Sequence, residues 1–219
     1  MKILLFLSGF RQLEEYKYFN IFYEKNKLLK EISDVFIYCN NPEISEDIVT
    51  YYKNNSCKNK QLFITTKNMG HTKGGVEAVC SGIEMGLFKE YDYVLHFHPD
   101  IFIIDEVKLI NILNEHINND NIFLVNYSFH DHMDWYSFDF FIFKPKKLTQ
   151  NIFIEELSTF TEYPENYLYK MIHKYNIKHE IIKRYNNNNW IPRRIDDHIG
   201  LWHEHDLEKI QEYIKTNQS

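Results

Sequence analysis

Short apolar runs alternate with amphipathic segments from the N-terminus to residue 129, and this alternation constrains the fold more than any other feature. The apolar runs are typical of strands buried on both faces, and they lie at 2–10, 34–42, 61–70, 92–103 and 121–129. Segments with apolar residues at helical spacing lie between them, at 13–32, 43–55, 72–91 and 105–119. This order predicts an α/β/α sandwich around a mainly parallel mixed sheet, with right-handed crossovers.

Beyond residue 129 the order of elements is less regular. The sequence predicts a strand at 138–143, a helix at 164–178, a short strand at 179–185 and a final helix within 198–216, after a loop rich in His and Trp. No linker and no internal repeat divides the 219 residues, so we expect a single domain.

The composition argues against several classes of protein. Hydrophobic residues make up 44% of the chain, which is enough for a substantial core, and a net charge of -6 argues against a nucleic-acid partner. No run of about 18 apolar residues is present, so no transmembrane segment is expected. The apolar run at 3–7 has no cleavage site after it and is read as a strand rather than a signal peptide. Three scattered cysteines, Cys39, Cys57 and Cys80, suit a reducing, cytoplasmic location.

Polar residues and glycines follow each of the first four predicted strands. Because ligands of such sheets bind beyond the carboxyl ends of the strands, we expect these residues to converge on one edge. They are Ser8, Gly9 and the adjacent Phe10 after the first strand, Asn40 after the second, Asn68 and Gly70 after the third, and His98 and Asp100 after the fourth.

The stretch His98-Pro99-Asp100 is the most informative of these strand ends. A carboxylate at this place can hold a hard divalent cation that also binds diphosphate oxygens, and an imidazole ligand favours Mn²⁺ over Mg²⁺. The alternative is structural: Asp100 caps the turn and the imidazoles pack against their neighbours.

The segment "YDYVLHFHPDIFI" at 91–103 resembles the DxD region of GT-A-fold glycosyltransferases, which also follows the third strand near residue 100. His98 stands in place of the first Asp, whereas Asp100 matches the Asp that more often coordinates the metal directly. The resemblance implies a metal site with Asp100 and either His98 or His203 as ligands. It also allows His98 to contact the donor ribose or phosphate instead.

The segment "NMGHTKGGVEAVCSGIEMG" at 68–86 is similar to the Asn/Gly-rich loop and helix that lie by the nucleotide in the same family. Glycines allow the backbone to approach a phosphate or ribose closely, and Lys73 adds positive charge. The spacing fits neither a P-loop nor a dinucleotide-binding fingerprint, so a plain loop before a glycine-packed helix is the alternative.

The segment "TEYPENYLYKMIHKYNIK" at 161–178 resembles the xED motif, with Glu165-Asn166 in place of Glu-Asp. The resemblance implies that Glu165 is the general base, and the dipole at a helix N-terminus would keep it ionised. Asp139, Asp134 and Glu162 are competing candidates, with Asp139 as the second catalytic residue. A plain first-turn glutamate is the structural alternative.

The segment "HIGLWHEHD" at 198–206 occupies the position of a C-terminal His that completes the metal or diphosphate site in GT-A enzymes. His203 is the first choice and His205 the second, although histidines at alternate positions also occur on surfaces. The order of the motifs follows the family across nearly the whole chain.

Residues 129–145 combine two His and three Asp with aromatic residues, a mixture that suits a sugar site. Aromatic rings stack on pyranose faces, and carboxylates accept hydrogen bonds from hydroxyl groups. Asp134 and Trp135 are the candidate acceptor-binding residues, and the part from 138 to 143 is read as an aromatic core strand.

The resemblance therefore implies a glycosyltransferase with a nucleotide-sugar-binding half at 1–127 and an acceptor-binding half at 128–219. The implied donor is a nucleotide-diphosphate sugar, with a UDP-sugar favoured, and the implied acceptor is a glycan, a lipid-linked molecule or a protein. Mn²⁺ or Mg²⁺ is the implied cofactor, and inversion is favoured over retention.

Three other functions stay open from the sequence. A sugar-nucleotide nucleotidyltransferase shares this type of sheet, but it needs a Gly-rich, basic loop after the first strand, where only Gly9 and Arg11 are present. A non-catalytic sugar- or nucleotide-binding protein of the same fold is the second. A metal-dependent hydrolase is the third, and it needs at least three converging metal ligands.

Overall fold

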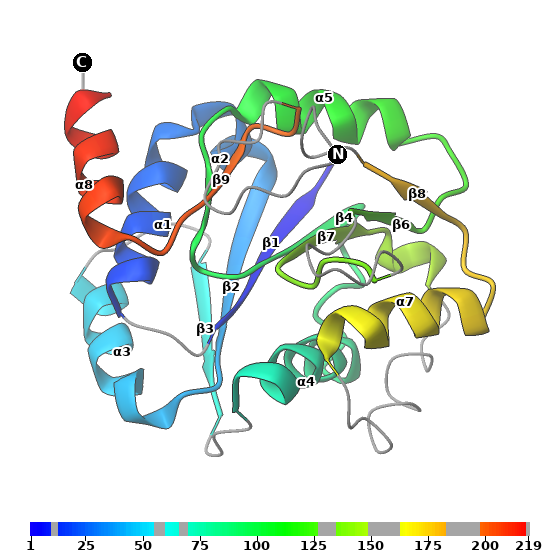
Figure 1. The fold of residues 1–219 in the computed structure, drawn as a ribbon, viewed down its shortest axis with the longest axis horizontal. Coiled ribbons are helices and arrows are strands. Elements are labelled where there is room, and N and C mark those ends of the chain that lie inside the picture. The colour runs from blue at the N-terminus through cyan, green and yellow to red at the C-terminus, as the bar shows by residue number, and fades with distance from the viewer. Residues whose placement is uncertain are drawn as a thin grey trace.

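The computed structural model describes residues 1–9, 13–54, 60–65, 70–126, 135–148, 163–182 and 198–217. A seven-stranded sheet lies at its centre, in the order β3-β2-β1-β4-β7-β6-β8 (Figure 1). Strand β7 is antiparallel to both of its neighbours, and every other pair in the sheet is parallel. The strands are β1 (Ile3–Gly9), β2 (Ser33–Cys39), β3 (Lys60–Ile64), β4 (Tyr93–Phe97), β6 (Phe123–Val125), β7 (Phe140–Phe143) and β8 (His179–Ile181). The predicted mainly parallel mixed sheet in a single domain is confirmed.

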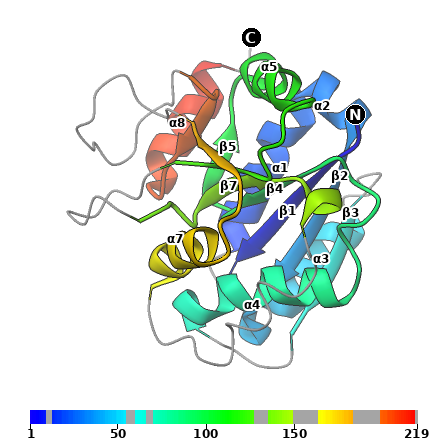
Figure 2. The ribbon, with the colours of Figure 1, turned by 90° about the vertical axis from the view of Figure 1, so that its right-hand side faces the viewer.

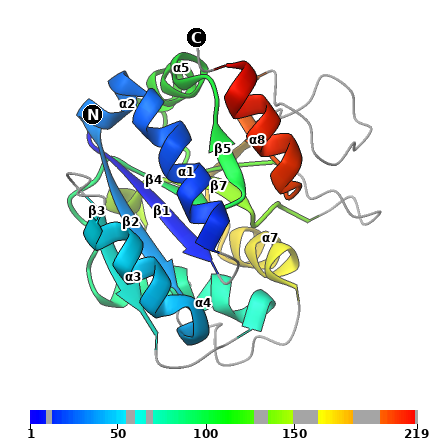
Figure 3. The same cartoon turned by 90° about the vertical axis from the view of Figure 1, so that its left-hand side faces the viewer.

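Helices cover both faces of the sheet. On one face lie α1 (Leu13–Lys25), α2 (Lys27–Ile32), α3 (Ser45–Asn54), α5 (Glu106–His116) and α8 (Leu207–Thr216). Figure 3 shows α1, α3 and α8 together on this side. On the other face, α4 (Gly70–Glu84) and α7 (Pro164–Lys174) lie side by side (Figure 2).

Strand β1 explains why the chain needs helices on both faces. Ile3, Leu5 and Leu7 belong to the core under α1, whereas Leu4 and Phe6 belong to the core under α4 and α7. Successive side chains of a strand point to opposite faces, so a continuous apolar run supplies two cores at once. Burial of these side chains is the main force that holds the layers together.

Two predicted elements are interrupted in the structure. The predicted helix at 13–32 is two helices, because the Asn26 side chain donates hydrogen bonds to the carbonyl groups of Phe22 and Ile103, both at 2.9 Å. The prediction of one continuous strand at 92–103 is also wrong, because the structure has two strands in this segment, β4 and a shorter one at 101–103. The chain turns at Pro99, and the N–H of Ile101 donates to the carbonyl of His98 at 3.1 Å.

The residues after this turn form β5 (Ile101–Ile103), which leaves the main sheet. It pairs in antiparallel fashion with β9 (Leu201–His203), in a separate two-stranded sheet. The sequence predicted a loop at 201–203, since a strand of three residues carries too short a pattern to be recognised. This small sheet brings the C-terminal histidines next to Asp100.

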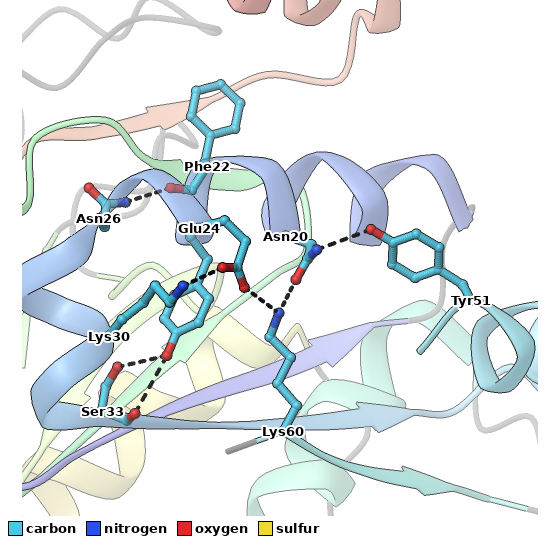
Figure 4. A network of polar contacts seen from close by, with 9 residues as sticks. Asn20, Phe22, Glu24, Asn26, Lys30, Ser33, Tyr51 and Lys60 are labelled. Carbon is cyan, nitrogen blue, oxygen red and sulfur yellow. Dashed lines mark hydrogen bonds and ion pairs between the residues drawn. The ribbon is translucent and has the colours of Figure 1, made fainter. Parts of the chain in front are cut away.

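A polar network holds the edge strand β3 against α1 (Figure 4). The Lys60 side chain is only 5% exposed, and its ammonium group contacts Asn20 and Glu24 of α1. Asn20 also donates to the Tyr51 hydroxyl of α3 at 3.1 Å, and Glu24 pairs with Lys30. Lys60 is the first residue of β3, so this network lies at the opposite end of the sheet from the predicted ligand edge and has a structural role.

Among the residues that the structure describes, no helix is both long and apolar enough to span a bilayer.

Candidate functional site

The turn after β4 and the residue before β7 form the centre of the candidate site. Phe97 pairs with Phe140 in the antiparallel ladder between these strands. The ladder continues by one step, because the N–H of His98 donates to the carbonyl of Asp139 at 2.9 Å. Strand β7 runs against its neighbours, so its first residues lie at the same edge as the last residues of β4. This arrangement places Asp139 beside the His98-Pro99-Asp100 turn.

Asp100, His203 and His205 converge on one carboxylate oxygen. The Nε2 atom of His203 lies 3.4 Å from Oδ2 of Asp100, and Nδ1 of His205 lies 2.6 Å from the same oxygen. The Asp100 side chain is only 2% exposed, whereas the two imidazoles are partly exposed. All three residues offer ligand atoms within 4.8 Å of one another, a spacing that suits a metal ion.

The backbone around these residues is held firmly. His203 pairs with Ile101 in the β5–β9 ladder, and the N–H of Glu204 donates to the carbonyl of Asp100 at 3.1 Å. The buried Glu204 carboxylate accepts hydrogen bonds from the N–H groups of His205 and Asp206, at 2.9 and 3.0 Å. These bonds fix the loop that presents His205 to Asp100.

The charge state of Asp100 follows from its surroundings. Burial alone raises the pKa of its carboxyl group, but the hydrogen bonds from His203 and His205, together with the positive charge of His203 and His98, outweigh burial and hold the pKa well below its usual range. Asp100 is therefore an ionised carboxylate inside the protein, which is the form that binds a cation.

Asp139 lies between two imidazoles. Its Oδ1 atom is 3.2 Å from Nδ1 of His98, and its Oδ2 atom is 4.0 Å from Nδ1 of His203. His203 therefore faces Asp100 with one ring nitrogen and Asp139 with the other. The group of Asp100, His203 and His205 does not include His98, whose Nδ1 faces Asp139.

Helix α4 begins over the end of β2. The Asn40 side chain donates to the carbonyl of Gly70 at 3.2 Å, and its backbone N–H donates to Gly9 at 3.1 Å. Gly70 has a φ of 78°, which favours glycine, and a Cβ at Gly74 would lie 1.5 Å from the Asn40 amide. This close contact requires glycine at position 74. Lys73 lies in the same first turns, half-buried.

The end of β1 is packed from both sides. The Ser8 hydroxyl lies 2.7 Å from Nε2 of His96, and both side chains are buried. A Cβ at Gly9 would lie 2.3 Å from the Tyr16 hydroxyl and 2.6 Å from Pro99, so Gly9 is also required by close packing. The Ser8 side chain is therefore engaged within the protein, and its backbone belongs to the ladder between β1 and β2.

The predicted acceptor side is described only in part. Trp135 lies against Tyr163, with ring centroids 5.8 Å apart, and Tyr163 is 60% exposed. Glu165 follows two residues later in the first turn of α7 and is half-buried. Four other predicted site residues lie outside the described residues: Phe10, Asn68, Asp134 and Glu162.

The sequence ranked His205 below His203 and did not foresee that Asp139 would pair with His98. The spacing His-x-His was the available signal, since alternate residues of an extended chain point to the same side. The pairing of Asp139 depends on the antiparallel register of β7, for which the sequence had no local signal.

Solved structures with a similar fold include glycosyltransferases and nucleotidyltransferases. A mannosyltransferase from Pyrobaculum calidifontis, solved with GDP-Man and Mn²⁺, matches with a TM-score of 0.58 at 8% identity, covering 85% of this chain and 58% of its own. A glycosyltransferase involved in glycosylation of the major capsid of PBCV-1 matches with a TM-score of 0.58 at 9% identity, covering 99% and 100%. A cytidylyltransferase from Leptospira borgpetersenii matches with a TM-score of 0.55 at 15% identity, covering 100% and 95%.

These likenesses show a GT-A-type fold, as the sequence resemblance predicted. The chain spans only 58% of the length of the mannosyltransferase. No protein-family model and no curated protein sequence matches this chain.

Proposed function

We propose that this protein is a glycosyltransferase that moves a sugar from a nucleotide-diphosphate donor to an acceptor hydroxyl group, with the help of a divalent cation. The observation that carries the proposal is the buried, ionised Asp100, which faces His203 and His205 beside the carboxyl edge of a GT-A-type sheet. The mannosyltransferase of similar fold was solved with a nucleotide sugar and Mn²⁺, which supports this choice of ligands.

The donor is proposed to lie across the ends of β1, β2 and β4. The backbone of Ser8 to Phe10, Asn40 and the loop with Asn68 and Gly70 would hold the nucleotide, and Lys73 would add positive charge. His98 is also proposed to contact the donor, because it lies beside the first turns of α4, with Nε2 3.9 Å from the Cβ position at Gly75. We favour a UDP-sugar among the nucleotide sugars.

The residues present fit a divalent cation. A buried carboxylate and two imidazoles within 4.8 Å of one another form a donor set that suits Mn²⁺. Asp100 and His203 would hold the ion, and a bound ion would neutralise charge that develops on the leaving diphosphate. Asp139, which faces the second nitrogen of His203, would keep this imidazole in the required orientation.

Glu165 is the proposed general base, which takes the proton of the acceptor hydroxyl and so leads to inversion at the anomeric carbon. The dipole at the start of α7 favours its ionised form. Trp135 is the proposed stacking surface for an acceptor sugar, together with Asp134. Trp135 stands four positions before Asp139 in the sequence, so their Cα atoms lie within about 14 Å, which is compatible with an acceptor near the proposed reacting groups.

A second candidate is a nucleotidyltransferase. The match to the cytidylyltransferase from Leptospira borgpetersenii supports this candidate, and it covers nearly the whole of both chains, as does the match to the PBCV-1 glycosyltransferase. Such an enzyme transfers a nucleotidyl group to a phosphate instead of transferring a sugar, so its substrates are a nucleoside triphosphate and a phosphorylated acceptor.

Thermal-shift measurements with UDP-, GDP- and dTDP-sugars, each with and without Mn²⁺, test the proposal. We expect one nucleotide sugar to raise the melting temperature, more so with Mn²⁺, and the same compound to be hydrolysed slowly to nucleoside diphosphate. Stabilisation without any turnover indicates a binding protein. Stabilisation by a nucleoside triphosphate, with pyrophosphate release upon addition of a sugar phosphate, indicates a nucleotidyltransferase. Either result overturns the proposal.

A further inference from the structure

Three side chains of the candidate site, Asp100, His203 and His205, offer potential metal-ligand atoms close to one another. A single carboxylate at the end of a strand would offer fewer ligands. His203 approaches Oδ2 of Asp100 at 3.4 Å, and His205 approaches the same oxygen at 2.6 Å. The two imidazoles stand edge to face, with centroids 4.8 Å apart and an interplanar angle of 79°. One ligand atom from each of the three residues lies within 4.8 Å of the others, a spacing that allows a single ion to contact all three.

The donors are held in place by the protein itself. The β5–β9 ladder fixes His203 relative to Asp100, and the Glu204 carboxylate holds the N–H of His205. Asp206 then starts α8 by accepting hydrogen bonds from the N–H groups of Glu208 and Lys209. A site assembled in this way binds an ion without a large cost for ordering its ligands.

The chemistry of the donors discriminates between cations. Mg²⁺ prefers oxygen ligands in octahedral geometry and keeps several water molecules. Imidazole nitrogens suit first-row transition ions, whose affinity rises from Mn²⁺ to Co²⁺ and is also higher for Zn²⁺ than for Mn²⁺. Two nitrogen donors and one carboxylate therefore favour transition ions over Mg²⁺.

We propose that Asp100, His203 and His205 form a two-histidine, one-carboxylate site that binds a transition-metal ion in the absence of a nucleotide sugar and selects against Mg²⁺. His205 is the third ligand, and His98, whose Nδ1 faces Asp139, is not a ligand. The role of this ion in sugar transfer rests on the proposed function, but its binding does not.

Calorimetric titration of the full, chelator-stripped chain with Zn²⁺, Co²⁺, Mn²⁺ and Mg²⁺, without nucleotide, tests the site. We expect one ion per chain, with Zn²⁺ and Co²⁺ binding more tightly than Mn²⁺, and no displacement of Mn²⁺ by an equal concentration of Mg²⁺. Electron spin-echo spectra of the Mn²⁺ form should show coupling to imidazole nitrogens.

Two variants keep the hydrogen bond to Asp100 but remove the imidazole ligand. In His205→Asn the amide nitrogen replaces Nδ1, and in His203→Gln it replaces Nε2. We expect each variant to lower the affinity for Mn²⁺ at least about tenfold, because even the loss of a group that only hydrogen-bonds to a metal ligand has an effect of about this size. The coupling to imidazole nitrogens should also decrease. His173→Gln, which removes an exposed imidazole from α7, should bind Mn²⁺ like the original protein. A thermal melt of each variant confirms that it is folded.

Three results would overturn the site: Mn²⁺ affinity unchanged in both variants, equal competition by Mg²⁺, or ion binding only when a nucleotide sugar is present. In the last case the glycosyltransferase proposal survives. If the ion binds in the expected order and no nucleotide sugar binds, the site stands and the glycosyltransferase proposal falls.

Discussion

His98 and Asp139 are joined through both backbone and side chain. The N–H of His98 donates to the carbonyl of Asp139 at 2.9 Å, and Nδ1 of His98 lies 3.2 Å from Oδ1 of Asp139. His98 stands at the position that resembles the first acid of DxD sequences. The imidazole pairs with a carboxylate on the neighbouring strand, and Asp100 faces the two C-terminal histidines.

Replacement of His98 by Asn is therefore expected to leave metal binding almost intact. Asn keeps a donor that can reach Asp139, so the Mn²⁺ affinity should change by less than about threefold, well under the tenfold effect of losing a ligand. The KM for the donor should rise, because Nε2 of His98 is lost from the donor side. Calorimetry measures the Mn²⁺ affinity, and initial-rate kinetics measure the KM. If His98→Asn lost as much Mn²⁺ affinity as Asp100→Asn, His98 would be identified as a metal ligand.

Glu165→Gln tests the general base. The amide keeps the size of the side chain but accepts no proton, so kcat should fall by about 10²–10⁴-fold with little change in the KM for the donor. Glu208→Gln is a matched control, since Glu208 also lies in the first turn of a helix and is exposed. Unchanged kcat in Glu165→Gln assigns the base to another carboxylate.

Gly74→Ala tests the close contact between α4 and β2. The new Cβ would lie 1.5 Å from the Asn40 amide, so Asn40 or the helix must move. We expect a loss of about 1–3 kcal/mol in the free energy of unfolding, typical of overpacking, and weaker donor binding. Gly75→Ala is a control for stability only, because its nearest contact is the Phe138 ring at 3.1 Å and its Cβ would also lie 3.9 Å from the His98 imidazole. Urea unfolding compares the two variants, donor titration compares Gly74→Ala with the original protein, and equal stability of the variants would show that the contact with Asn40 is loose.

The buried His96 predicts how stability depends on pH. Burial, aided by the positive charge of His98, holds the pKa of His96 well below its usual range, despite a hydrogen bond with the Phe138 backbone. Below about pH 6.5 the unfolded chain binds a proton that the folded chain does not, so stability falls as the pH is lowered, by up to about 1.4 kcal/mol per pH unit.

His96→Leu removes this titration at similar volume. From pH 7 to pH 5.5 the original protein should lose more free energy of unfolding than the variant, whatever the difference between them at pH 7. Urea unfolding at each pH measures both slopes. Parallel slopes would show that His96 titrates as it does in the unfolded chain.

The fold was predictable because its strongest signals are local. Leu4 and Phe6 alternate with Ile3, Leu5 and Leu7, and this continuous apolar run identifies a strand covered on both faces. The turn at Pro99 has a local signal in the proline itself, whereas the pairing of Ile101 with His203 was not predictable, because it joins residues about a hundred positions apart.

The candidate site was predictable in part for the same reason. Asp100 follows a strong apolar strand, so its position at the sheet edge follows from the strand alone. The choice between His98, His203 and His205 as its neighbours depends on the β5–β9 ladder and on the antiparallel direction of β7, and neither leaves a local pattern. Roles for these residues stay predictions until they are measured.

Release of nucleoside diphosphate from the nucleotide sugar that stabilises the protein, measured at saturating Mn²⁺ for the original chain and for Asp100→Asn, tests the central claim most directly. The account predicts that Asp100→Asn lowers the rate at least about 10²-fold, a loss of nearly 3 kcal/mol of transition-state stabilisation. Asp120→Asn, which alters a carboxylate that is 76% exposed, should leave the rate unchanged. An undiminished rate in Asp100→Asn would contradict the account.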